Sequence, residues 1–389
     1  MSAKLQAPRG TADVLPDDAT RREAVEAAAR RVLGAAGYRR VETPAFEATE
    51  LFRRTVGEST DIVQKEMYTF EDGSGRSLTL RPEGTAPVCR AYLEHGMQKL
   101  PQPVKLWYLS SFFRYERAQA GRQRQFWQVG TEAIGSGDPA LDAESILLLA
   151  ELLEAVGARE TRLRLSSLGT PQTRAAYREE LQAYLRAHEE RLSEEVRGRI
   201  DANPLRAFDA DHPGTREVMA GAPRLLDRLT GEDAEHFAEV RALLDAADLA
   251  YELDPTLVRG LDYYARTVFE FTSDALGAQS GVGGGGRYDG LIEQLGGPPT
   301  PAVGWAAGIE RMLLAAAEQP VGEPVVDLYV AIAEPTAGRA AAFQIAHEAR
   351  RAGLAAQLEL AGRSLKGQLK QADRIGARWV AILGEEARR

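Results

Sequence analysis

The 389-residue sequence predicts an α+β protein with a mainly β core, a helical insertion and a small α/β domain near its end. Strand-like runs occupy residues 105–132, with a loop over AQAGRQ, and return from residue 257. Between them, residues 170–249 are helical in pattern and highly charged, which indicates an insertion. From residue 326 the order changes to β-α-β-α-β, which is typical of a separate α/β unit.

Local signals place individual helices within this outline. Asp17 and Asp18 are candidate caps of a first helix that Gly37 ends. Asp138 and Pro139 begin a second helix, which runs through a leucine-rich stretch to about residue 157.

Glycine and proline mark two further segments. GVGGGGRYDG, at residues 281–290, is interpreted as a turn, and the alternative is a backbone that approaches a ligand closely. EQPVGEP, at residues 318–324, has the composition of a linker. A strand that leads into a helix is expected between these two segments.

Composition and charge exclude several classes of protein. The net charge of −9 excludes a protein that covers DNA through its overall positive charge, so any nucleic-acid contact would need local basic patches. Cys89 is the only cysteine, which excludes an internal disulfide and a zinc site with several cysteines. The first residues, MSAKLQAPRG, have no apolar signal region, and no run approaches the ~18 apolar residues of a membrane span. We therefore predict a cytoplasmic protein without membrane association.

Arginine is concentrated in FRYERAQAGRQRQF, at residues 113–126, which contains no lysine. The guanidinium fork matches carboxylate and phosphate bidentately, so this pattern favours a site for polyanionic groups. Unrelated surface ion pairs, each contributing about 0–1 kcal/mol, are the alternative. The sequence has no GxxxxGK[ST] loop, and its histidines lie outside every arginine-rich segment, which disfavours a histidine-based triad. The arginines of interest are Arg114, Arg117, Arg122, Arg124, Arg259 and Arg311.

Five segments resemble the histidyl-tRNA synthetase family of class II aminoacyl-tRNA synthetases. RGLDYY followed by RTVFE is the most specific of them, and Pro44 stands where motif 1 of the class has its proline. The resemblance covers the chain from residue 7 onward. The segments are RRVETPAFEATELF (39–52, motif 1), LTLRPEGTAP (78–87), FRYERAQAGRQRQFWQVGTE (113–132, motif 2), LVRGLDYYARTVFEF (257–271) and PAVGWAAGIERM (301–312, motif 3).

This resemblance implies a class II antiparallel-sheet catalytic core, a helical insertion and a C-terminal α/β anticodon-binding domain. In the family that last domain continues beyond a strand like RWVAILG, so we expect it to be incomplete here. The implied domains are a catalytic core at 1–168 and 251–317, the insertion at 169–250, a linker at 318–325 and the anticodon-binding domain at 326–389.

The resemblance also implies an activity and its partners. L-histidine would react with ATP, accompanied by Mg²⁺, to give histidyl-adenylate, and histidine tRNA would then take the histidyl group. A homodimer built around motif 1 is implied as well. No protein ligand for a metal is expected. The alternative is the related regulatory subunit of ATP phosphoribosyltransferase, which has the core fold but acts as a protein partner and histidine sensor.

Individual roles carry over by position. Arg114 and Arg259 match the catalytic arginines on either side of the α-phosphate, and Arg311 matches the arginine on the γ-phosphate. Glu116 resembles the residue near adenine. Arg117 and Gln119 match positions that meet the extra 5′ nucleotide of histidine tRNA. The implied histidine-binding residues are Glu83, Gly84, Thr85, Arg114, Gln128, Glu132, Arg259, Tyr263 and Tyr264.

Within that set, Glu132 and Tyr264 are implied to read the two imidazole nitrogens, and Tyr263 to line the pocket. Glu83 and Thr85, with Gln128, are implied to hold the ammonium group.

Overall fold

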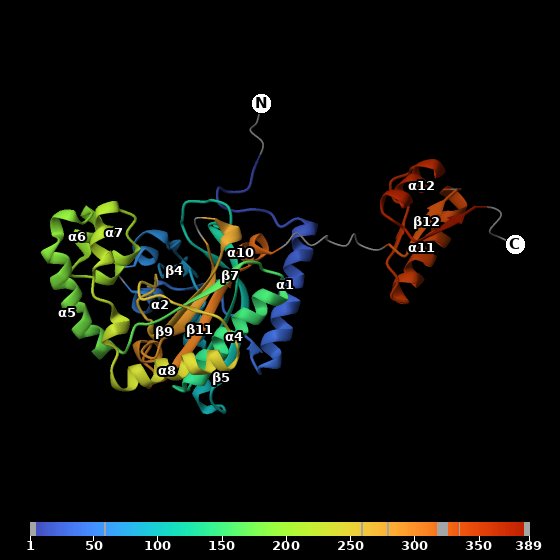
Figure 1. The fold of residues 1–389 in the computed structure, drawn as a ribbon. Coiled ribbons are helices and arrows are strands. Elements are labelled where there is room, and N and C mark those ends of the chain that lie inside the picture. Colours follow the sequence, from blue (N-terminus) through green and yellow to red (C-terminus); the bar gives the residue numbers. More distant parts are fainter. Residues whose placement is uncertain are drawn as a thin grey trace. The chain divides into compact units, whose positions relative to one another are not determined.

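The computed structural model describes residues 5–57, 60–257, 260–277, 280–316, 326–333 and 335–384. The chain divides into two compact units, residues 1–318 and residues 319–389, both drawn in Figure 1.

An eight-stranded sheet forms the centre of the first unit (Figure 1). Its order is β1-β5-β6-β11-β10-β9-β7-β8, and the inner strands pair antiparallel while the two edge pairs are parallel. The predicted α+β class is therefore confirmed. The strands are β1 (Arg39–Arg40), β5 (Val104–Phe113), β6 (Gln125–Ile134), β7 (Thr161–Ser167), β8 (Glu252–Leu253), β9 (Ala265–Ser273), β10 (Gly281–Arg287) and β11 (Ala302–Gly308).

The remaining elements of this unit surround the large sheet. A small sheet combines β2 (Phe46–Ala48), β3 (Thr69–Glu71) and β4 (Ser77–Leu80). The α-helices are α1 (Pro16–Ala35), α2 (Thr49–Val56), α3 (Thr85–Glu94), α4 (Pro139–Ala155), α5 (Pro171–Ala187), α6 (Glu194–Arg199), α7 (Pro213–Ala220), α8 (Gly231–Ala246), α9 (Leu291–Gln294) and α10 (Ile309–Ala315).

The two faces of the large sheet carry different hydrophobic clusters, because successive side chains of a strand point to opposite faces. Trp107, Val129 and Trp305 belong to a cluster that also contains side chains of α1, α4 and α8. Tyr108 and Phe112 belong to a second cluster, which contains side chains of α3 and α5. The second face is the one that carries the candidate site.

The predicted insertion contains α5 to α8 and is not a separate compact unit. Phe237, Val240 and Leu244 of α8 lie in the same hydrophobic cluster as α1 and α4. The last helix of the insertion therefore supports the sheet directly.

Helix boundaries differ from the sequence prediction at one end. Helix α1 begins at Pro16, so Asp17 and Asp18 lie in its first turn, and no side chain caps it. The predicted caps were wrong, although carboxylates in a first turn still interact favourably with the helix dipole. Asp138, in contrast, caps α4 as predicted, since its side chain accepts a backbone N–H at 2.9 Å.

The glycine-rich segment differs more. Residues 281–287 form β10, which pairs with β9 on one side and β11 on the other, so the predicted turn was wrong for these residues. A Cβ atom at Gly285 would lie only 1.9 Å from the carbonyl oxygen of Gly304. Close approach between strands therefore requires glycine here.

The second unit has the expected β-α-β-α-β order. Its parallel sheet has the strand order β13-β12-β14. The predicted linker at 318–325 lies outside the described residues. Across the described parts of both units, no helix is long and apolar enough to cross a membrane. The elements are β12 (Leu328–Ile332), α11 (Pro335–Arg351), β13 (Ala356–Leu358), α12 (Leu365–Arg374) and β14 (Trp379–Leu383).

A buried ion pair ties the end of β10 to α4. Arg287 and Asp142 are both fully buried, and the Nε atom of Arg287 lies 3.2 and 3.1 Å from the two carboxylate oxygens. Its Nη1 atom also donates to the carbonyl of Ser136 at 2.9 Å and to Asp289 at 3.1 Å. These bonds fix the chain where it leaves the glycine-rich strand.

We expect Arg287→Met to lower the free energy of unfolding by about 3–5 kcal/mol, because it leaves the Asp142 carboxylate buried without its partner. Urea unfolding followed by circular dichroism measures this change. Arg228→Gln, which breaks an exposed pair with Glu180, is the control and should leave the midpoint unchanged. Equal midpoints for both variants would show that the buried pair does not anchor the fold.

Candidate active site

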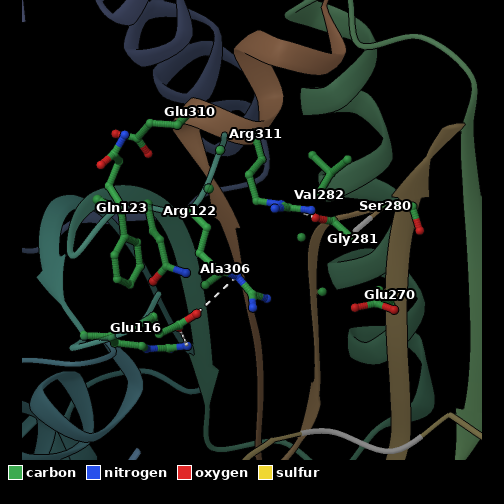
Figure 2. Close-up of a pocket in the computed structure, with 17 residues that line it drawn as sticks. Glu116, Arg122, Gln123, Glu270, Ser280, Gly281, Val282, Ala306, Glu310 and Arg311 are labelled. Atoms are coloured by element: carbon green, nitrogen blue, oxygen red, sulfur yellow. Dashed lines mark hydrogen bonds and ion pairs between the residues drawn. The ribbon is translucent and has the colours of Figure 1, made fainter. Parts of the chain in front are cut away.

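A pocket of about 650 Å³ opens on the second face of the large sheet. Figure 2 shows side chains of Arg122, Arg311 and Glu270 directed into it from different elements. Its walls come from β6, β9, β10, β11, the β5–β6 loop and the start of α10. The lining residues are Arg114, Glu116, Gly121, Arg122, Gln123, Phe126, Gln128, Glu270, Ser280, Gly281, Val282, Gly283, Gly284, Ala306, Gly308, Glu310 and Arg311.

Arg114 is held at the point where β5 ends. Its Nε atom donates to the carbonyl of Pro82 at 2.9 Å. Its guanidinium lies over the ring of Phe126, 5.4 Å from the ring centroid, and 3.8 Å separates its Nη1 atom from a carboxylate oxygen of Glu116. The protein therefore orients this cation before any ligand binds.

The other arginines of the pocket concentrate positive charge. Arg122 lies 3.1 Å from Glu116, the ion pair marked in Figure 2. Arg311 donates from Nε to the carbonyl of Gly281. Burial lowers the pKa of Arg311, and the charge of Arg122 acts in the same direction, whereas Glu270 and Glu116 act against it. The charge of an anionic ligand would offset both effects by favouring the charged guanidinium.

Two glutamates of the pocket have arginine partners that do not line it. Glu310 lies 2.7 Å from Arg22, and Glu270 lies 3.2 Å from Arg164. These pairs reduce the negative charge that the pocket arginines experience. The arrangement therefore favours a ligand with several negative charges.

Beyond the pocket arginines, Glu132 lies on the same strand face as Gln128 and is fully buried. Its carboxylate accepts hydrogen bonds from the Thr85 hydroxyl at 2.8 Å, from the Tyr108 hydroxyl at 3.5 Å and from the Tyr288 hydroxyl. Burial raises the pKa of Glu132 to about 8; the Tyr288 and Thr85 hydrogen bonds oppose the rise. A buried carboxylate of this kind can accept a hydrogen bond from a polar ligand.

Glycines leave the space that these groups fill. A Cβ atom at Gly84 or Gly130 would lie 2.4 or 2.2 Å from the ring of Tyr108. A Cβ atom at Gly304 would lie 2.1 Å from a carboxylate oxygen of Glu132. Side chains at these positions would displace the carboxylate and its donors.

The predicted ammonium-binding residues are close to this cluster but already make bonds of their own. The Glu83 carboxylate accepts the backbone N–H groups of Thr85 and Ala86 at 2.7 and 3.0 Å, which fixes the start of α3. Burial raises the pKa of Glu83, and those backbone bonds oppose the rise. In the part of the chain that the structure describes, the buried amide oxygen of Gln128 has no hydrogen-bond partner, so it is available to a ligand donor.

The two tyrosines of the RGLDYY segment are both buried, and their rings lie 4.7 Å apart at 54°. Burial raises the pKa of Tyr263 well above its usual value. Arg259 lies outside the described residues. Arg117 and Gln119 are exposed on the loop between β5 and β6.

Tyr108, Phe126, Glu270 and Tyr288 are among the residues of the site that were missed in the sequence. Phe126 lies two residues before Gln128 on β6, and Tyr108 lies on the paired strand β5. The alternation of side chains along a strand could therefore have assigned all three to the same face of the sheet. Glu270 and Tyr288 gave no such signal, because only strand pairing brings Glu270 to the pocket and Tyr288 to Glu132.

An antiparallel sheet with this arginine-lined pocket on one face is the catalytic core of a class II aminoacyl-tRNA synthetase. Residues 10–312 match the histidyl-tRNA synthetase family, and the chain belongs to that family. It is 51% identical to the histidine–tRNA ligase of Halorhodospira halophila over 98% of this chain and 90% of that protein. Identity to the Synechococcus enzyme of the same name is 49%, over 98% and 91%.

A solved structure resembles the fold over nearly its whole length. Apo histidyl-tRNA synthetase from S. aureus superposes with a TM-score of 0.82 at 36% identity, covering 98% of this chain and 92% of that one. The architecture predicted from the sequence is thus that of the family.

We expect Gly304→Ala to lower the free energy of unfolding by about 1–3 kcal/mol, because the added methyl group overpacks the Glu132 carboxylate. Thermal unfolding measures the change. Gly34→Ala is the matched control: nothing lies within 4 Å of a Cβ atom there, and alanine favours the helix. Unchanged stability of Gly304→Ala would show that the sheet accommodates the methyl group by moving.

Proposed function

We propose that this protein activates L-histidine with ATP and transfers it to the 3′ end of histidine tRNA. The observation that carries this proposal is the pairing of two environments in one site. Glu132, buried among hydroxyl donors, suits a polar ring, and the neighbouring arginine pocket suits a polyphosphate. Membership of the histidyl-tRNA synthetase family supports the same activity.

Glu132 and Tyr264 would recognise the imidazole ring. A ring with two polar nitrogens needs a polar partner at each, and a carboxylate and a phenol supply them. Analogues without these nitrogens would leave buried polar groups unpaired, which is a strong basis for rejection. Tyr263 would line the pocket beside them.

The ammonium group would bind between Gln128 and the start of α3. The unpartnered Gln128 amide oxygen is the first acceptor, and Thr85 and the charge of Glu83 would add to it. Gly84 has no side chain, so the ring of Tyr108 can approach it closely. Gly84 would therefore shape this side of the pocket without contacting the imidazole ring.

The arginines would orient and stabilise the reacting anions. Adenylate formation needs no general base, because the attacking carboxylate of histidine is already ionised at neutral pH. Arg114 would hold this carboxylate and the α-phosphate together, Arg259 would face the phosphate from the other side, and Arg311 would bind the γ-phosphate. Glu116 would lie near adenine. Fixed guanidinium groups stabilise the charge that gathers on the phosphate without a cost for reorienting water.

Mg²⁺ would enter with ATP. No group of three or more histidine, cysteine, aspartate or glutamate residues in the described ranges could hold a metal alone. This fits a magnesium ion held mainly by phosphate oxygens and water, with one or two carboxylates. Glu270 lines the pocket and would be such a carboxylate. The ion would neutralise phosphate charge during attack.

The remaining assignments concern tRNA and assembly. Arg117 and Gln119, which are exposed, would meet the 5′ end of histidine tRNA, and residues 326–389 would bind the anticodon. A homodimer would form around motif 1, where Phe46 and Phe70 pack together, 49% and 43% exposed. We assign the protein to the cytoplasm.

Histidine-dependent exchange of pyrophosphate into ATP, followed by charging of histidine tRNA, tests the whole proposal. A regulatory subunit of ATP phosphoribosyltransferase would catalyse neither reaction. Exchange without charging would limit the activity to histidine activation.

Glu132→Gln should weaken the use of histidine by about 1.5–3 kcal/mol, because the hydrogen bond to a charged acceptor is lost. The KM for ATP should stay nearly constant. Exchange kinetics at varied histidine measure both values, and unchanged histidine kinetics would remove Glu132 from the imidazole pocket.

Arg259→Ala should slow exchange by about 10²–10³-fold, the usual effect of losing one preorganised donor. Arg259→Lys should recover only part of the rate, because a point charge does not reproduce the guanidinium fork. Exchange at saturating substrates is the measurement, with thermal unfolding as a check on the fold. A variant Arg259→Ala that retained more than about a tenth of the rate would contradict this role.

A further inference from the structure

We propose that Tyr288 is a positioning residue for histidine recognition, whose hydroxyl fixes the Glu132 carboxylate and keeps it in the form that accepts the imidazole. This inference rests on the proposed function. It assigns a purpose to the RYDG end of the glycine-rich segment, which the roles above leave without one.

The hydrogen bonds to Glu132 leave room for one more donor. A carboxylate has about four acceptor positions, two on each oxygen. Thr85 and Tyr108 both donate to Oε1, and Tyr288 donates to Oε2. The remaining position is on Oε2, beside the Tyr288 hydroxyl. Tyr288 therefore determines where the free acceptor lies.

Tyr288 is itself held firmly on both sides. Its side chain is buried, and its ring meets that of Tyr263 edge to face, with 5.6 Å between centroids. The preceding residue, Arg287, is anchored to Asp142 and Asp289. The hydroxyl is thus placed by a buried ion pair on one side and by aromatic packing on the other.

Gly304 and Gly286 allow the contact to form. The carboxylate oxygen that bonds Tyr288 occupies the space of a Cβ atom at Gly304, 2.1 Å away. A Cβ atom at Gly286 would lie 3.1 Å from the ring of Tyr264. The glycines of two neighbouring strands therefore bring Glu132, Tyr264 and Tyr288 together.

The charge state of Glu132 depends on several groups around it. Burial disfavours the carboxylate, and the charge of Glu83 on the segment before α3 does so as well. The hydroxyl donors oppose both, and Tyr288 is the largest of them. The titratable groups that face or sense Glu132 are Tyr38 after α1, Glu83 and Cys89 at α3, Tyr108 on β5, Tyr263 before β9 and Tyr288 after β10.

The direction of the pH effect follows from these groups. The hydroxyl of Tyr288 stabilises ionised Glu132, so its removal raises the pKa of Glu132. More of the carboxyl is then protonated at neutral pH and cannot accept the imidazole N–H. Because the deficit comes from protonation, it diminishes as pH rises.

Tyr288→Phe tests this, since it removes the hydroxyl and keeps the ring. We expect kcat/KM for histidine in pyrophosphate exchange at pH 7 to fall about tenfold, mainly through KM, with the KM for ATP unchanged. Between pH 6 and 9.5, the acidic limb of this profile should move upward by about one pH unit. Tyr108→Phe should move it the same way but less, because that hydroxyl lies 3.5 Å away.

Tyr177→Phe is the matched control, because its buried hydroxyl donates to the carbonyl of Pro223 at 2.9 Å, outside the site. A loss in Tyr288→Phe that is equal at every pH, or a profile like that of Tyr177→Phe, would overturn the positioning role. If Tyr288→Phe does not fold, the acidic limb of the pH profile of Tyr108→Phe is the deciding measurement. An acidic limb that does not move in this variant overturns the proposal.

The same series separates this inference from the proposed function. If the unmodified protein catalyses no histidine-dependent exchange, the proposed function fails. If exchange occurs and Glu132→Gln impairs it while Tyr288→Phe does not, only the role of Tyr288 fails.

Discussion

The burial of the Glu132 carboxylate is the constraint on which the rest of the site depends. A carboxylate removed from water destabilises the fold unless donors surround it. Here three hydroxyl groups, from Thr85, Tyr108 and Tyr288, supply them. The ring of Tyr108 and the carboxylate itself fit only because Gly84, Gly130 and Gly304 carry no side chain. These glycines and the hydroxyl donors are thus two consequences of one buried carboxyl group.

At the other end of the site, the arginine pocket concentrates positive charge. Arg114 and Arg311 are each fixed through Nε to a backbone carbonyl. These bonds set the orientation of the guanidinium groups without neutralising them. A chain with a net charge of −9 can therefore present a local cationic pocket. Glu310 and Glu270, which line the pocket, are paired to Arg22 and Arg164, so they reduce this charge less than their number suggests.

The sequence was sufficient for what depends on local pattern. Alternation along β6 predicts that Gln128 and Glu132 share a face, and Asp138 identifies the start of α4. It was insufficient where packing overrides propensity. Glycine is unfavourable in strands, so residues 281–287 suggested a turn. They form β10 through pairing with β9 and β11, and glycine is needed at Gly285 because a Cβ atom there would lie 1.9 Å from the Gly304 carbonyl oxygen. Tyr288 was missed because only the pairing of β10 with its neighbours brings its hydroxyl to Glu132.

The two ends of the site are connected through β6, and this connection links specificity to chemistry. Glu132 and Gln128 project from one face of that strand. Phe126, two residues before Gln128, lies beneath the guanidinium of Arg114. A ligand whose ring reaches Glu132 and whose ammonium reaches Gln128 would direct its carboxylate toward Arg114. A shorter or apolar side chain would lack the contact at Glu132 that sets this direction. In the proposed function, the rigid spacing of a β-strand would therefore couple recognition of the side chain to placement of the reacting group.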